Sequence, residues 1–383
     1  MKENEKKFSA NEKVNLFQDT GVQFLDFDVD LSDINIRELY EICCFTKESM
    51  HLCERVQPGG VSLDKSAGKN EYEDMVTFER YSGSTPFEKI ELDDVLKAFE
   101  KHWIPLPYYM SIDNAGCFAE EPLNWCRCYF RKIADYKYKM VLAFDTAVKD
   151  SAQTGLENHL LQQKHINNGS EYRLCHNFSA IYRFASQSFF TPTLQKYWEE
   201  YAEEQEFSPK KIENGKTDKV YVGYYQAFLR MLAEPRFVVL PRIKMEPFND
   251  KKATVDVSLV LDIGNSRVYG LILEGAEELK NSYPLVLRDL SDPTIEYRHP
   301  FSSSVEFADP SFSVQYNELG YTNFQWHSMV RTGDEAMKHS CTLIGNESQS
   351  GMSSPKRYLW DTDPVKYEWH VNPNTIENPE DGT

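Results

Sequence analysis

The sequence lacks the features of a membrane-spanning protein, a secreted protein or a zinc-binding protein. No run of about 18 apolar residues occurs anywhere, so the sequence predicts no membrane span. The first residues, MKENEKKFSANEK, contain no apolar core of the kind that a secretory signal requires. None of the eight cysteines belongs to a C-x-x-C pair, and we favour buried thiols over a zinc site. Together these absences predict a cytoplasmic chain.

Positive charge is also scarce. Lysine and arginine number 42 against 60 acidic residues, which gives a formal net charge of -18. Such a chain repels nucleic-acid phosphates and anionic membrane surfaces, so we do not expect nucleic acid as a partner. The 22 Tyr and 23 Phe residues therefore predict a core and a protein interface rather than a surface for stacking bases. Proteins are the expected partners.

The common phosphate-loop and hydrolase motifs are missing as well. The Gly-Lys-Thr triplet at 215–217 has Lys210 where a P-loop requires its first glycine. The triplet at 68–70 fails in the same way, because Leu63 occupies the glycine position. No G-x-S-x-G sequence occurs, so the chain offers no nucleophile elbow for a serine hydrolase.

What is present indicates two domains of mixed secondary structure. The charged turn at 248–253 predicts a boundary between a domain at 1–250 and one at 251–383. Apolar spacing predicts the elements of the first domain, an α+β region of unknown role. They are a strand pair around Gly21, a helix over 38–53, a polar loop over 56–74, a helix over 93–103, a central strand over 136–148, helices over 193–207 and 223–234 on either side of a charged segment at 208–219, and a strand over 237–248.

The second domain opens with three apolar segments, at 256–262, 267–274 and 284–290. The segments are separated by turns, which predicts an antiparallel β-meander. Their near-continuous apolar character is typical of a sheet that is covered on both faces. We therefore expect an α/β chain whose second part begins with a core sheet.

The first turn of this meander predicts a site for phosphate and Mg²⁺. Gly264 lets the backbone approach a ligand closely, and the successive amides of Asn265, Ser266 and Arg267 can converge on an anion. Asp262 stands at the end of the preceding strand, where its carboxylate can hold Mg²⁺ through water. The alternative is an ordinary β-hairpin in which the Asp and Asn side chains make an Asx-turn.

The turn is similar to the first phosphate motif of the actin, Hsp70 and sugar kinase superfamily. Three further segments resemble the next motifs of the first lobe, in the same order: HPFSSSVEF at 299–307, TGDEA at 332–336 and SSPKRYLWD at 353–361. The resemblance covers 255–361 and implies a ribonuclease H-like first lobe that binds ATP and Mg²⁺. In Hsp70 the last segment supplies a lysine to the γ-phosphate, and the matching residue here is Lys356. A surface lysine at a helix start after Pro355 is the alternative.

A wider resemblance links almost the whole chain to the SrfB virulence factor family of bacterial proteins. The segments that carry it are GVQFLDF at 21–27, HWIPLPYY at 102–109, VLAFDTAV at 141–148, LDIGNSR at 261–267 and SSPKRYLWD at 353–361. In that family the chain runs further, and a second phosphate motif of the Asp-Gly-Gly-Gly-Thr type follows. No such motif occurs here, and the final Asp381, Gly382 and Thr383 are too short to serve. The resemblance therefore implies the front part of a longer protein.

The leading functional hypothesis is an ATP-binding, actin/Hsp70-like module. In it Asp262 handles Mg²⁺, the residues from Gly264 to Ser266 hold the β- and γ-phosphates, and Lys356 neutralises the transferred phosphoryl group. The turn should project its amides into a cleft beside Asp262, and Lys356 should lie within reach of that cleft. We expect ATPase activity only within a longer chain that completes the site.

Two other functions remain open. One is a protein-interaction module with a vestigial nucleotide site, because Arg267 and Tyr269 stand where relatives often carry small or hydroxyl residues. The other is a small-molecule kinase, because residues 261–268 also resemble the opening of type III pantothenate kinases. Asp145 and Thr146 imitate the phosphate motif without its glycine, and we expect an Asx-turn or a cap there.

Overall fold

The computed structural model describes two units of the chain. It covers residues 12–34, 43–46, 51–55, 71–82, 87–109, 124–148, 161, 163–175, 177–185, 191–247, 256–275, 282–307, 330–342 and 352–356. The fold is mixed α/β, and its contacts place the described residues up to 247 in one unit and those from 256 on in the other. Some predicted segments lie outside the described residues, namely 38–42, 47–50, 56–70 and 357–361.

A four-stranded antiparallel sheet carries much of the core of the first unit. Its order is β2 (Val22–Asp30), β10 (Lys137–Asp145), β9 (Cys126–Ala134) and β8 (Ile104–Leu106). β10 lies inside this sheet and is buried from Met140 to Asp145, which confirms the predicted central strand. After β10, the Asp145 carboxylate accepts a hydrogen bond from the amide of Ala147 at 3.0 Å, so the predicted Asx-turn is confirmed.

A three-stranded sheet corrects the pairing predicted around Gly21. Its order is β1 (Lys13–Phe17), β12 (Arg242–Glu246) and β11 (Glu171–Tyr172). β1 runs parallel to β12, whereas β2 pairs with β10, so the two strands on either side of Gly21 do not pair with each other. The reason is the longer ladder that β10 offers, because all 9 residues of β2 find a partner on it.

A five-stranded sheet replaces the helix predicted over 38–53. Its order is β6 (Arg80–Ser82), β5 (Glu71–Asp74), β4 (Leu52–Arg55), β3 (Cys43–Thr46) and β7 (Phe87–Ile90). The helix prediction is wrong because tertiary packing overrides the local apolar spacing. Leu52 is fully buried, and its amide donates to the Gln226 side chain at 3.0 Å. β5 likewise replaces the end of the predicted polar loop.

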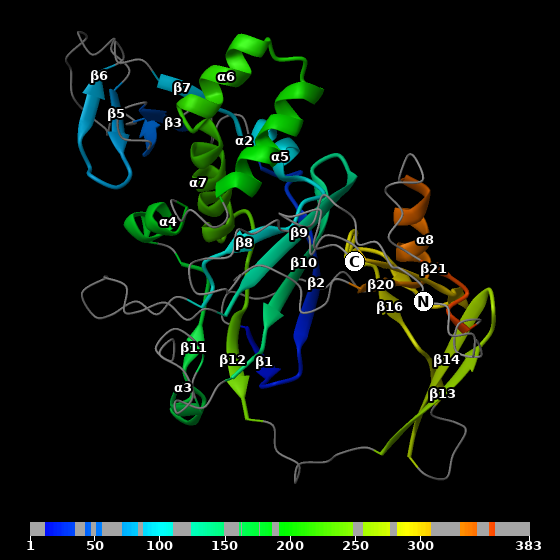
Figure 1. Ribbon diagram of the computed structural model, residues 1–383. Coiled ribbons are helices and arrows are strands. Elements are labelled where there is room, and N and C mark those ends of the chain that lie inside the picture. The colour runs from blue at the N-terminus through cyan, green and yellow to red at the C-terminus, as the bar shows by residue number, and fades with distance from the viewer. Residues whose placement is uncertain are drawn as a thin grey trace, which may run out of the picture. The chain divides into compact units, whose positions relative to one another are not determined.

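Helices complete the first unit. They are α2 (Leu92–Phe99), α3 (Gln163–Asn167), α4 (Phe178–Ala185), α5 (Thr191–Glu204), α6 (Pro209–Thr217) and α7 (Val220–Ala233). α2, α5 and α7 pack against one another (Figure 1), which confirms three predicted helices. α6 was not predicted, because it lies in the charged segment at 208–219 that separates two predicted helices. Ser208 caps this helix and Pro209 is its first residue. Over the described residues, no helix has the length and apolar character needed to cross a membrane.

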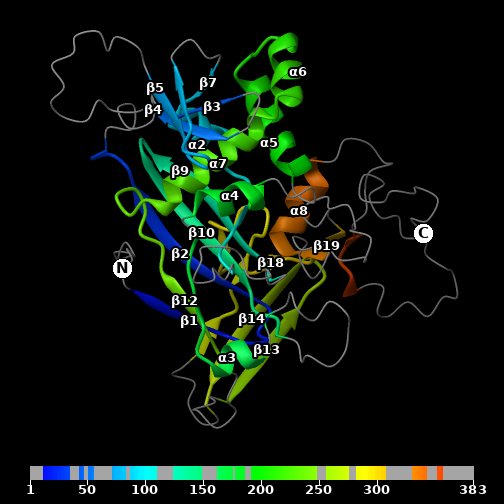
Figure 2. The ribbon, with the colours of Figure 1, turned by 90° about the vertical axis from the view of Figure 1, so that its left-hand side faces the viewer.

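The second unit is built from short antiparallel strands and one described helix. One sheet has the order β13 (Val257–Ile263), β14 (Arg267–Glu274) and β15 (Ser282–Pro284), with β18 (Phe301–Ser302) also paired to β14. Another has the order β20 (Val330–Thr332), β19 (Ser304–Phe307) and β21 (Met352–Ser353), and β16 (Leu287–Arg288) pairs with β17 (Glu296–Tyr297). α8 (Gly333–Thr342) packs on β18 and β19 (Figure 2).

The opening meander is present, but two of its details differ from the prediction. The segment at 284–290 is not one strand, because β15 ends at Pro284 and β16 pairs with β17 instead. β13 is exposed along its whole length instead of being covered on both faces. The physical reason is that the extensive contacts of β13 are with its strand neighbour β14, so no described element packs on its faces.

Candidate functional site

The hairpin between β13 and β14 ends in a tight turn at the predicted phosphate site. The amide of Gly264 donates to the carbonyl oxygen of Arg267 at 2.9 Å, so Asn265 and Ser266 form the tip. A Cβ on Gly264 would lie 2.7 Å from that same oxygen, closer than such contacts occur. The turn itself therefore requires glycine at this position.

The hydrogen-bond pattern of the hairpin shows which backbone groups face outward. The Asp256 carbonyl accepts from the Gly275 amide at 2.8 Å, and the Gly264 amide donates to Arg267, so the even-numbered residues of β13 bond to β14. In an antiparallel ladder this alternates from residue to residue. The odd-numbered residues, including Ile263, therefore direct their amides and carbonyls to the outer edge.

Lys356 lies at that outer edge, beside the turn. Its ammonium group donates to the carbonyl oxygen of Ile263 at 2.8 Å, although 93 positions separate the two residues in the sequence. Lys356 follows β21 and Ser354, whose φ of 58° is positive. The structure thus brings the predicted lysine to the residue between Asp262 and Gly264. Its catalytic role stays a prediction.

Ser303 connects the turn to the segment that carries Lys356. Its amide donates to the Ser266 carbonyl at 2.9 Å, and its own carbonyl accepts from the Ser354 amide at 2.7 Å. The Ser303 hydroxyl is buried and has no hydrogen-bond partner within the part of the chain that the structure describes. The residue that is hydrogen-bonded directly to the turn therefore carries a buried hydroxyl that could donate a hydrogen bond. The sequence prediction did not single out Ser303, which lies in the Ser-Ser-Ser run of its second motif.

The other predicted ligands differ in their surroundings. Asp262 is exposed and opposite Tyr269 in the ladder, and its carboxylate makes no hydrogen bond or ion pair with any described residue. The amides of Asn265 and Ser266 also have no hydrogen-bond partner over the described ranges. The Arg267 guanidinium donates to the Pro300 carbonyl at 2.8 Å, so its charge is directed to the loop before β18. Asp262 and the two tip amides are thus the groups open to a ligand.

A buried polar network lies under α8 and was missed in the sequence. The Asp289 carboxylate accepts from the amides of Ser291 and Asp292 at 2.9 and 3.0 Å, from the Tyr297 hydroxyl at 2.8 Å and from Lys338 at 2.9 Å. Burial opposes ionisation, but these hydrogen bonds outweigh it and hold the pKa of Asp289 below its usual value. The network ties α8 to the segment between β16 and β17. The sequence did contain a signal for this turn, because Asp289 follows an apolar segment and comes two residues before Ser-Asp-Pro, which is typical of an Asx-turn.

A second polar cluster lies in the first unit, around His51 and Asp74. His51 Nδ1 lies 2.9 Å from a carboxylate oxygen of Asp74, which is fully buried. The other oxygen accepts from the amides of Val76 and Thr77 at 2.7 and 2.9 Å. The cluster joins β4 to the turn after β5. Across the described ranges, no group of three or more His, Cys, Asp or Glu side chains is placed to hold a metal ion.

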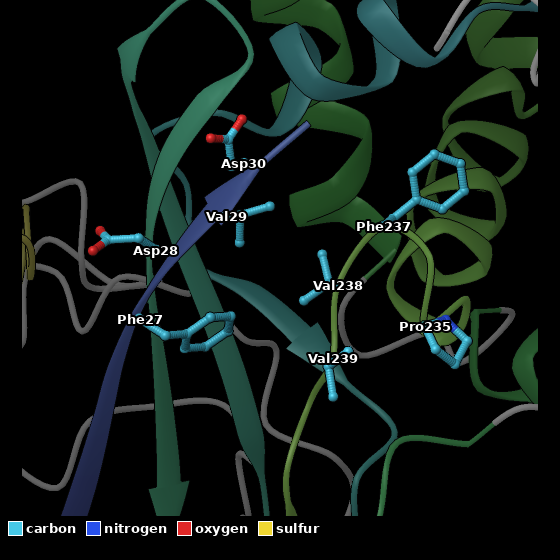
Figure 3. A pocket seen from close by; sticks show the side chains of 8 residues that line it. All are labelled: Phe27, Asp28, Val29, Asp30, Pro235, Phe237, Val238 and Val239. Atoms are coloured by element: carbon cyan, nitrogen blue, oxygen red, sulfur yellow. The ribbon is translucent and has the colours of Figure 1, made fainter. Parts of the chain in front are cut away.

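A cavity between β2 and the segment after α7 is too small for a nucleotide. Figure 3 shows Phe27 and Val29 directed toward Val238 and Val239, with Asp28 and Asp30 on the other face of β2. The cavity volume is about 140 Å³, and a neighbouring one that shares Val238 and Val239 has about 190 Å³. Small-molecule sites usually measure about 300 to 1,000 Å³. Neither cavity therefore offers a nucleotide site.

Comparison with known proteins gives a family but no relative of established structure. A family model described as virulence factor SrfB matches residues 5–381, nearly the whole chain. No curated protein and no solved structure matches it.

Proposed function

We propose that this chain, which belongs to the virulence factor SrfB family, binds the phosphates of Mg²⁺-ATP at the hairpin turn of its second unit. The observation that carries the proposal is the meeting of two distant motifs, because Lys356 donates to Ile263 at the foot of the turn. The turn thus brings together a lysine, two amides and a carboxylate. The amides and the carboxylate have no hydrogen-bond partner among the described residues. Such a set of groups is suited to a polyphosphate with a divalent cation.

Each group has a role that its surroundings support. Asp262 holds Mg²⁺ through water, since its carboxylate is exposed and uses no described partner. The amides of Asn265 and Ser266 donate to phosphate oxygens, and Gly264 is required to shape the turn. Lys356 exchanges the Ile263 carbonyl for a phosphate oxygen, which is a stronger acceptor. When bound, Mg²⁺ supplies charge neutralisation of the phosphates.

The same arrangement supports an actin/Hsp70-like first lobe. Four sequence motifs that follow in the order of that superfamily are neighbours in space. The hairpin strand β14 pairs with β18, β19 pairs with β21 just before Lys356, and α8, which begins at Gly333, packs on β18 and β19. This proximity of the four segments is the structural support for the proposed first lobe.

The affinity follows from the number of donors. Charge-assisted hydrogen bonds contribute about 1.5 to 3 kcal/mol each, and immobilising the ligand costs several kcal/mol. The net charge of -18 further opposes an anion at long range. We expect a dissociation constant of about 1 mM, near -4 kcal/mol. We expect no measurable turnover by this chain alone, because one hairpin neither encloses the phosphates nor orients an attacking group.

A phosphorus NMR titration of Mg²⁺-ATP with the purified chain tests the proposal. Asp262→Ala should weaken binding at least about tenfold, which corresponds to about 1.4 kcal/mol, and Lys356→Gln should weaken it severalfold. The matched control is Asp256→Ala, which removes the same charge from an exposed residue just before the same strand, roughly 20 Å from Asp262. Equal losses in both aspartate variants, or no binding by the wild type at about 10 mM ATP, would contradict it.

An interaction module with a vestigial site is the second candidate. The observation that favours it is the exposure of apolar residues along β13, which a nucleotide site at the turn does not explain. If the hairpin has lost nucleotide binding, all three variants and the wild type will give the same flat titration.

A further inference from the structure

β13 exposes an apolar strand edge that, apart from Lys356 at Ile263, no described part of the second unit covers. Five of its seven residues are large, apolar and between 44% and 57% exposed: Val257, Leu259, Val260, Leu261 and Ile263. In the described sheet, β14 is the strand on one side of β13, and the other side has no strand. Folded proteins normally guard such an edge with proline, lysine or a bulge, because it pairs with other strands. Within β13 itself, Asp262 is the sole charged residue.

We propose that this edge pairs with β13 of a second copy of the chain. The two strands run antiparallel about a two-fold axis at Val260, so Leu259 of each copy faces Leu261 of the other. Isologous pairing of this kind makes one continuous sheet from the two hairpins.

The hydrogen bonds of the free edge fit this register. The odd-numbered residues of β13 direct their amides and carbonyls outward, since the even-numbered ones bond to β14. Leu259 and Leu261 of the two copies therefore form hydrogen-bonded pairs, and Val257 pairs with Ile263. Val260 of one copy faces Val260 of the other in a pair without hydrogen bonds, where the side chains stand closest.

The charges on the strand select the same register. With the axis at Val260, Asp262 faces Ser258, and no acid faces an acid. With the axis at Leu259, Asp262 would face Asp256, and like charges directly opposite each other are destabilising. An axis at Val260 also keeps all seven residues of β13 in the ladder, so it buries the most apolar surface.

Lys356 and the net charge limit the association. Lys356 already donates to the Ile263 carbonyl, so the Val257–Ile263 pair at each end of the ladder uses the Ile263 amide, and the ladder stops at the turn. Each copy carries a formal charge of -18, so the copies repel each other unless salt screens the charge. One strand pair is smaller than a standard interface, so the dimer is transient and its fraction rises with protein concentration and with salt.

Disulfide trapping of Val260→Cys tests the register. Opposed residues without hydrogen bonds have Cα atoms about 4.5 Å apart, within the range that a disulfide spans. Under mild oxidation this variant should form a covalent dimer well above the wild-type background. Ser258→Cys, which faces Asp262 of the other copy, is the matched control on the same strand face and should not exceed that background.

Sedimentation of the full chain tests the surface independently. Wild type should show a dimer fraction that rises with concentration, and Leu259→Lys, at an exposed position, should remove it without changing the melting temperature. A wild type that stays monomeric with no Val260→Cys cross-link overturns the proposal and leaves the edge to a strand of another protein. A dimer that persists in Leu259→Lys overturns it too, because another surface then holds the copies together.

Discussion

Removal of the Asp289 carboxylate is the most demanding test of the packing in the second unit. Asp289 is 1% exposed and accepts four hydrogen bonds: two from backbone amides, one from Tyr297 and one from Lys338. Asp289→Ala removes the acceptor of the Asp292 amide, the Tyr297 hydroxyl and Lys338, while the Ser291 amide keeps a second acceptor in the Glu335 carboxylate at 3.0 Å. Lys338 is 52% exposed and turns to solvent, whereas the Asp292 amide and the Tyr297 hydroxyl lose a buried partner.

The magnitude follows from this division. Removing one partner of a buried charged network typically costs about 3 to 5 kcal/mol. The lower end applies here, since Lys338 regains water, and we expect about 3 kcal/mol. The ion pair itself contributes less than about 1 kcal/mol, as half-exposed pairs do. Lys338→Met should therefore destabilise the unit far less than Asp289→Ala.

Native-state hydrogen exchange of the peptide that covers α8 measures the effect locally. In Asp289→Ala this peptide should exchange roughly 150-fold faster, which corresponds to about 3 kcal/mol. Asp334→Ala, in the first turn of the same helix, serves as the control and should change the free energy by only about 0.3 to 1 kcal/mol. An acceleration below about threefold in Asp289→Ala, or an equal effect in Lys338→Met, would refute the reasoning.

Three further predictions concern other parts of the chain. Gly215→Ala should destabilise the first unit by about 1 to 3 kcal/mol despite better helix propensity, because its Cβ would lie 2.1 Å from the buried Trp198 ring; unchanged thermal melting would contradict this. Burial and neighbouring lysines lower the pKa of His102 from 6.5 to about 4, so the unfolded chain binds its proton first and stability falls by roughly 3 kcal/mol from pH 6.5 to 4. His102→Phe should flatten that slope, and an unchanged slope would contradict it. Gly264→Ala should weaken Mg²⁺-ATP binding while leaving the melting temperature of the first unit unchanged, since its Cβ would strike the Arg267 carbonyl.

The elements that the sequence predicted well are those in which local spacing and tertiary burial agree. α2, α5 and α7 each carry apolar residues at helical spacing, and β10 is a long run of residues buried inside its sheet. The pairing of strands was harder to predict from the sequence. β1 finds β12 more than 200 positions away, and no local pattern encodes that choice.

The wrong and missed elements have identifiable causes. The segment that contains β3 and β4 has apolar residues at helical spacing, but packing of Leu52 against α7 decides the outcome. α6 is charged on most sides, so it lacked an apolar stripe and was recognisable only by its Ser-Pro start. β13 has the apolar character of a covered strand and lies exposed, because no described element packs on its faces.

The candidate site could be predicted in part. Gly264 and Asp262 were recognisable from a strand, an acid and a turn, and Lys356 from the order of motifs that resemble one superfamily. Spacing alone could not have joined Lys356 to Ile263. Ser303 was not predicted, because its position depends on backbone bonds to Ser266 and Ser354 that only the folded chain shows.

Affinity cleavage with Fe²⁺-ATP tests the central claim most directly. Fe²⁺ takes the place of Mg²⁺, and ascorbate with peroxide then cuts the backbone next to the bound metal, where mass spectrometry locates the cut. We predict ATP-dependent cuts within 262–267 and next to Lys356, abolished in Asp262→Ala and retained in Asp256→Ala. Cuts confined to the first unit, or cuts at the hairpin that persist in Asp262→Ala, would contradict a phosphate and metal site at this turn.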